Sequence, residues 1–102
     1  MQEIRVLLLG SPRILVDNVE RTPSRRKAVA LLTYLILRNT PENRQHLATL
    51  LWPDNTMSQS LGSLRNALSI LNRIGGFIQT DGQLVKIASE ANITVDVVDF
   101  SE

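Results

Sequence analysis

The chain has 102 residues, of which 43% are hydrophobic, so it can form one domain with a modest core but not two domains. It has no cysteine and one histidine, which excludes disulfides and the usual thiolate or histidine metal sites. The formal net charge is +1, but residues 87–102 carry only acidic charges, which leaves the body of the chain mildly basic.

Blocks of predicted strands and helices indicate an α+β fold in a single domain over residues 1–102. Short apolar runs bounded by Gly, Pro and Asp mark the strands, and apolar residues at steps of three and four mark the helices. The predicted order is strands over 3–9 and 13–17, a short strand from Val19, helices over 25–38, 44–52 and 57–74, and strands over 77–80, 83–87 and 93–97.

Capping residues predict where the helices begin. Thr22 or Ser24 is expected to cap the first helix, with Pro23 at its first position. Asn43 is expected to cap the second helix, and one of the residues 54–56 (Asp-Asn-Thr) the third. The apolar runs are too short to cross a bilayer and no signal peptide is visible, so we expect a cytoplasmic protein without a membrane partner.

The predicted third helix carries the clearest functional signal. Its leucines recur on one face and are expected in the core: Leu61, Leu64, Leu68 and Leu71. The remaining surface gathers hydrogen-bonding and basic side chains: Ser63, Arg65, Asn66, Ser69, Asn72 and Arg73. Asp81-Gly82 after it predicts a two-residue β-hairpin. A short helix, a helix with such a polar face and a hairpin together suit a DNA groove.

This order of elements resembles the OmpR/PhoB-type winged helix. It is still more similar to the N-terminal domain of SARP-type bacterial transcriptional activators, which precedes a helical-repeat (BTAD) domain. The segments that carry the likeness are IRVLLLGSPRI, SRRKAVALLTYLIL, HLATLLWPD, LGSLRNALSILNRIG and ITVDVVDF, and they span essentially the whole chain. The resemblance implies a winged helix-turn-helix with an N-terminal antiparallel sheet, a three-helix core and a C-terminal β-hairpin wing. It also implies that the chain is the N-terminal fragment of a longer regulator.

The function that this resemblance implies is sequence-specific binding of double-stranded DNA by a transcriptional activator. Helix 57–74 would read the major groove and hairpin 77–87 would be the wing. The wing contacts would be Gln79, Thr80, Gln83 and Lys86, and Arg25, Arg26 and Lys27 would be phosphate contacts or an ordinary solvated surface. Ile70 and Asn72 stand where related helices carry arginine, so we expect weak binding by an isolated monomer. RNA polymerase and a second copy on DNA are further partners that the resemblance allows.

The alternative is a winged-helix module that docks a protein through the same helix face or the wing, which the missing arginines favour. No nucleophile–base pair, paired acids in a cleft or phosphate loop stands out in the sequence, so we expect no enzyme, cofactor or metal. We expect His46 at the surface and Trp52 packed inside the fold.

Overall fold

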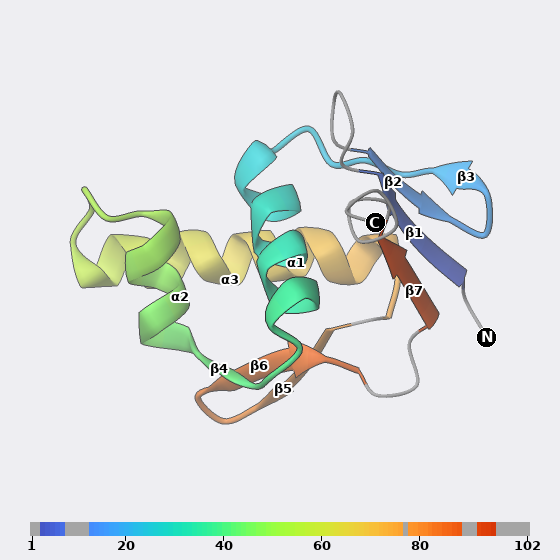
Figure 1. The fold of residues 1–102 in the computed structure, drawn as a ribbon. Helices are drawn as coiled ribbons and strands as arrows, with labels where there is room; N and C mark the ends of the chain where they lie inside the picture. Colours follow the sequence, from blue (N-terminus) through green and yellow to red (C-terminus); the bar gives the residue numbers. More distant parts are fainter. Residues whose placement is uncertain (1–2, 8–12, 77, 89–91, 96–102) are drawn as a thin grey trace.

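Three helices and two small sheets make up the part of the chain that the computed structural model describes, residues 3–7, 13–76, 78–88 and 92–95 (Figure 1). The helices are α1 (Arg26–Arg38), α2 (Arg44–Leu51) and α3 (Met57–Ile74). The strands are β1 (Glu3–Leu7), β2 (Arg13–Val16), β3 (Val19–Glu20), β4 (Glu42–Asn43), β5 (Ile78–Asp81), β6 (Leu84–Ile87) and β7 (Asn92–Val95). The predicted α+β class is therefore confirmed.

The first sheet has the strand order β3-β2-β1-β7. β1 pairs antiparallel with β2 but parallel with β7, with Ile4 opposite Ile93. The predicted antiparallel N-terminal sheet is confirmed for β1, β2 and β3, but the parallel pairing with β7 was not predicted, because alternation identifies a strand but not its neighbour or direction. Alternate residues of β1 and β2 are buried against the helices: Ile4, Val6, Ile14 and Val16. Phe77 and the predicted strand residues 8, 9, 96 and 97 lie outside the described part, as does most of the VDVVDF segment.

The helices form the core on which the rest of the fold depends. α3 is the longest, and α1 and α2 both pack against it (Figure 1). The predicted leucine face of α3 is confirmed, since Leu64, Leu68 and Leu71 are buried and Leu61 is half-buried. This packing fixes which surface of α3 faces outward.

Two of the predicted helix caps are confirmed and one is wrong. The Thr56 hydroxyl accepts a hydrogen bond from the backbone of Gln59, whose side chain accepts one from the Thr56 backbone, and both distances are 3.2 Å. Asn43 caps α2 through its side-chain oxygen, 2.8 Å from the Gln45 nitrogen. α1 instead begins after Arg25, whose side chain makes no capping bond.

The predicted caps of α1 are used elsewhere or lie outside the helix. The Thr22 hydroxyl accepts a hydrogen bond from the Ile14 backbone at 2.9 Å, so it belongs to the edge of the first sheet. Pro23 and Ser24 also precede the helix, which starts at Arg26. Local capping rules missed this because the partner of the Thr22 hydroxyl, Ile14, lies in β2, eight residues earlier.

The second sheet has the order β4-β6-β5 and contains the predicted hairpin. Asp81 pairs with Leu84, so the loop is Gly82-Gln83, one residue later than predicted. Gly82 has a φ of 62°, a left-handed conformation that glycine adopts without strain. β4 was not predicted, and its pairing with β6 joins the hairpin to the start of α2.

Among the described residues, no helix is both long and apolar enough to cross a membrane.

Candidate nucleic-acid interface

The outward surface of α3 is polar along most of its length. We call the six residues selected from the sequence the polar ridge: Ser63, Arg65, Asn66, Ser69, Asn72 and Arg73. Ser63 is half-buried and the other five are exposed. At 3.6 residues per turn, Ser63 and Asn66 fall on one flank of this ridge and Arg65 and Asn72 on the other. The ridge therefore presents hydrogen-bonding groups to two different sides.

The first flank of the polar ridge borders a hollow of about 390 Å³, which we call the α1 hollow. The residues that line it come from three elements and include Arg25, Arg26, Lys27, Trp52, Ser63 and Asn66. None of its lining residues is acidic. The predicted basic triplet is thus brought next to two residues of the polar ridge, Ser63 and Asn66.

The three cations of the α1 hollow differ in what they bind. The Lys27 ammonium donates to the Leu51 carbonyl at the end of α2 and lies 5.6 Å from the centre of the Trp52 ring. The guanidinium groups of Arg25 and Arg26 make no hydrogen bond or ion pair with any described residue. They stand at the positive end of α1, whose first turn has no acidic side chain. Two of the three cations can therefore bind an external anion without breaking an internal contact.

Trp52 forms part of the wall of this hollow and also of the core. Its side chain is half-buried and packs against the hydrophobic cluster, as predicted. Its carbonyl accepts a hydrogen bond from the buried Ser60 hydroxyl at 2.9 Å. This bond links the turn after α2 to the first part of α3 and fixes how the two helices meet.

The second flank of the polar ridge borders a hollow of about 410 Å³, which we call the hairpin hollow. Its lining includes Arg44, Arg65, Ser69, Asn72, Arg73 and Thr80, and again none of the lining residues is acidic. Arg44 was not selected from the sequence. Its position at the start of α2 could be predicted from the Asn43 cap, but its place beside the hairpin depends on the pairing of β4 with β6.

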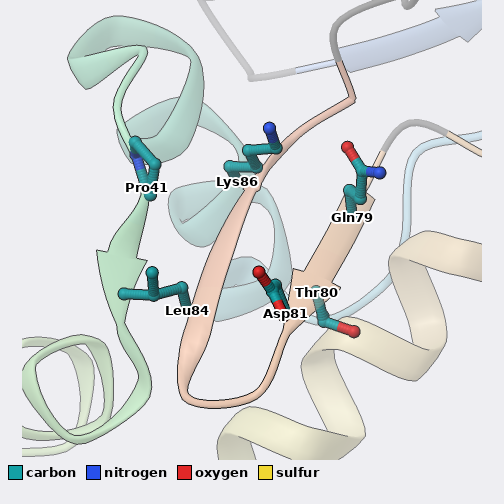
Figure 2. Close-up of a pocket in the computed structure, with 6 residues that line it drawn as sticks. All are labelled: Pro41, Gln79, Thr80, Asp81, Leu84 and Lys86. Atoms are coloured by element: carbon teal, nitrogen blue, oxygen red, sulfur yellow. The ribbon is translucent and has the colours of Figure 1, made fainter.

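The predicted wing residues border two hollows beside the hairpin. Thr80 lines the hairpin hollow beside α3. Gln79 and Lys86 are cross-strand partners and line a second hollow of about 250 Å³, together with Thr80, Asp81, Pro41 and Leu84 (Figure 2). Three of the four predicted wing residues therefore line one hollow, and Thr80 borders the hairpin hollow as well.

Gln83, the fourth predicted wing residue, lies in the hairpin loop and is exposed. Its backbone carbonyl accepts a hydrogen bond from the Arg44 nitrogen at 2.8 Å. The loop is thus held against the start of α2, and the Gln83 side chain is outside the α1 and hairpin hollows.

Positive charge is concentrated on both sides of the polar ridge. Three cations line each hollow, so the two together hold six of the eleven Lys and Arg residues and none of the ten Asp and Glu residues. Clefts lined by charges of one sign attract ligands of the opposite sign even when the whole molecule is almost neutral. The arrangement is suited to a polyanion that lies across α3.

Other chemistry finds less support in the described part of the chain, where no group of three His, Cys, Asp or Glu residues is placed to hold a metal ion. His46 is exposed, as predicted, and its Nε2 lies 3.4 Å from the Tyr34 hydroxyl.

No protein-family model matches the chain, and no curated protein matches it significantly. The geometry of the polar ridge and its two hollows is therefore the basis for the functional proposal.

Proposed function

We propose that this chain is a winged-helix domain that binds double-stranded DNA in transcription regulation. In this proposal α2 and α3 are the helix-turn-helix, α3 lies in the major groove, and the β5–β6 hairpin is the wing. The observation that carries the proposal is the polar ridge of α3 between two hollows that are lined by cations and contain no acid.

The dimensions of a helix and of DNA support this orientation. A helix with its side chains is about 10–12 Å across and the major groove is about 12 Å wide. When a helix fills the groove, the two phosphate backbones therefore run along its two flanks. The flanks of α3 are where the α1 hollow and the hairpin hollow lie. Arg25 and Arg26 would bind one backbone, and Arg65 and Arg73 the other or a guanine near it.

The centre of the polar ridge has the residue types that read bases. The amide of Asn66 can bond an adenine edge at two positions, which is worth roughly 1–3 kcal/mol of discrimination. The hydroxyls of Ser63 and Ser69 can donate to or accept from either a base or a phosphate. Asn66 and Ser69 are exposed, so both can reach a base without rearrangement of the core.

The regulatory setting belongs to the same proposal and is supported by the resemblance to OmpR/PhoB-type and SARP-type domains. The domain would act as the DNA-binding part of a cytoplasmic transcriptional activator. It would bind its site as two copies and contact RNA polymerase. The order of a short helix, a longer helix and a hairpin in the described fold is compatible with that architecture.

The experiment that tests the proposed function is selection of duplex fragments by the folded domain. Fragmented genomic DNA from the source organism is incubated with the protein at about 50 and 200 mM salt, and the retained fragments are sequenced. We expect a short motif to be enriched and retention to fall steeply at the higher salt concentration. Failure to retain any duplex at the lower salt concentration would contradict DNA binding.

Protein docking is a second candidate, favoured by the outer face of the hairpin. There Leu84 is 42% exposed and lies beside Pro41 in the hollow of about 250 Å³ (Figure 2). Ile70 of α3, in contrast, is half-buried and packs against the core. A protein partner would therefore use the outer face of the hairpin, and Leu84→Ser would abolish its binding without changing the retention of DNA.

A further inference from the structure

Arg44 joins the start of α2 to the tip of the hairpin. Its backbone nitrogen donates to the Gln83 carbonyl at 2.8 Å, and its side-chain Nε donates to the Gly82 carbonyl at 3.2 Å. These two carbonyls belong to the two residues of the hairpin loop. Beside them, the pairing of β4 with β6 ends at Asn43 and Leu84. Arg44 therefore continues the attachment of the hairpin beyond the last pair of the sheet.

Arg44 also lines the hairpin hollow, together with Arg65 and Arg73. An arginine side chain has five N–H donors, and the bond to Gly82 uses the one on Nε. The four Nη donors have no partner among the described residues. Because the Nε bond holds the plane of the guanidinium, these donors are oriented before any ligand binds, which lowers the entropy cost of binding.

We propose that Arg44 both positions the hairpin tip and binds a backbone phosphate of DNA that lies across α3. This inference rests on the proposed function and adds a residue and a role to it. The phosphate would occupy the hairpin hollow and accept hydrogen bonds from the Nη groups of Arg44. The same side chain would hold the hairpin at the distance from α3 that leaves room for the phosphate.

The test compares two substitutions that separate charge from geometry. Arg44→Gln removes the charge, and Arg44→Lys keeps the charge but removes the planar group that bonds both Gly82 and a phosphate. Binding to a fluorescent duplex of mixed sequence is measured between about 50 and 200 mM salt. Amide hydrogen exchange of β5 and β6 is measured in the protein without DNA. Arg5→Gln is the matched control, since Arg5 is exposed on β1 and lines neither hollow.

Arg44→Gln is expected to lower the slope of log K against log salt by roughly 0.9, the value for one phosphate contact. Arg44→Lys is expected to keep the slope of the parent but to bind more weakly, and both substitutions are expected to speed exchange in the hairpin. Arg5→Gln should change neither measurement. An unchanged slope in Arg44→Gln would show that Arg44 binds no phosphate, and unchanged exchange in both variants would show that it does not position the hairpin.

The two proposals fail in different ways in this experiment. If the parent protein binds the duplex and Arg44→Gln binds it equally well with the same slope, the inference about Arg44 is wrong and the proposed function stands. If the parent protein binds no duplex, the proposed function is wrong and the phosphate role of Arg44 is wrong with it. The exchange measurement still decides the positioning role in that case.

Discussion

Three consecutive cations at the start of α1 have different physical roles. Lys27 bonds the last carbonyl of α2 and lies over the Trp52 ring, whereas the guanidinium groups of Arg25 and Arg26 make no hydrogen bond, ion pair or ring contact with a described residue. A cation at the carboxyl end of a helix is favourable, and so is a cation over an aromatic face. The sequence pattern alone could not separate these roles, because the partner of Lys27 is 24 residues away.

Lys27 is therefore predicted to contribute to stability and Arg26 is not. Lys27→Met should lower the free energy of unfolding by about 1 kcal/mol, because it removes both the helix-end interaction and the ring contact. Urea unfolding followed by the emission of Trp52, the single tryptophan of the chain, measures this. Arg26→Met is the matched control and should unfold like the parent. Equal stability of Lys27→Met and the parent would contradict the assignment.

Arg65 and Arg73 are predicted to bind phosphate or a base edge next to it. Arg65→Ala and Arg73→Ala should each weaken duplex binding and reduce the salt slope by roughly 0.9. The measurement is a duplex titration at several salt concentrations. Arg13→Ala, an exposed cation on β2 outside both hollows, should leave the slope unchanged. If all three variants keep the salt slope of the parent, α3 does not contact the DNA.

Asn66 is predicted to affect sequence preference more than affinity. Asn66→Ala should relax the preference at one or two base pairs of the selected motif and leave the salt slope unchanged, because a neutral amide displaces no counterion. Sequencing of the fragments retained by the variant measures this directly. The prediction fails if the variant selects the motif of the parent with the same stringency at every position.

At the scale of the elements, the helices were predictable because their signals are local. α3 begins and ends at the residues expected from its leucine spacing, the Thr56 cap and Gly75. The strands were found from alternation, but their neighbours were not, since pairing depends on contacts between distant segments. The parallel pairing of β7 with β1 and the two-residue β4 are the clearest examples.

For the candidate site too, the features that lie on one helix could be predicted from the sequence, and the contacts between distant segments could not. The polar ridge follows from the periodicity of one helix, and five of its six residues are exposed as expected. Three of the four wing residues, Gln79, Thr80 and Lys86, line one hollow, although the hairpin loop is shifted by one residue from its predicted place. Arg44 was missed because its contact with Gly82 joins residues that are 38 positions apart.

The core position of α3 leads to a prediction about stability. Leu64 is fully buried, so Leu64→Ala should lower the free energy of unfolding by roughly 2–5 kcal/mol. Leu50 on α2 is 46% exposed, and Leu50→Ala should cost much less. Thermal unfolding of both variants by circular dichroism compares them. A Leu64→Ala protein that melts with the parent would mean that α3 is rotated from the orientation described.

At the scale of the whole molecule, the important property is where the charge lies. The total is nearly neutral, yet six cations and no acid line the two hollows beside the polar ridge. Helices α1 and α2 pack against α3, so the ridge is presented on the helical core of the fold (Figure 1). A rigid helix between two basic hollows is the basis of the proposal that the molecule binds duplex DNA.

The most direct measurement is a map of backbone amide chemical shifts during titration with a short mixed-sequence duplex. The proposal predicts shifts that concentrate in α3, the start of α1 and the tip of the hairpin, and that weaken when salt rises from about 50 to 200 mM. Shifts confined to the first sheet or to the outer face of the hairpin would contradict it, and so would a spectrum that the duplex does not change.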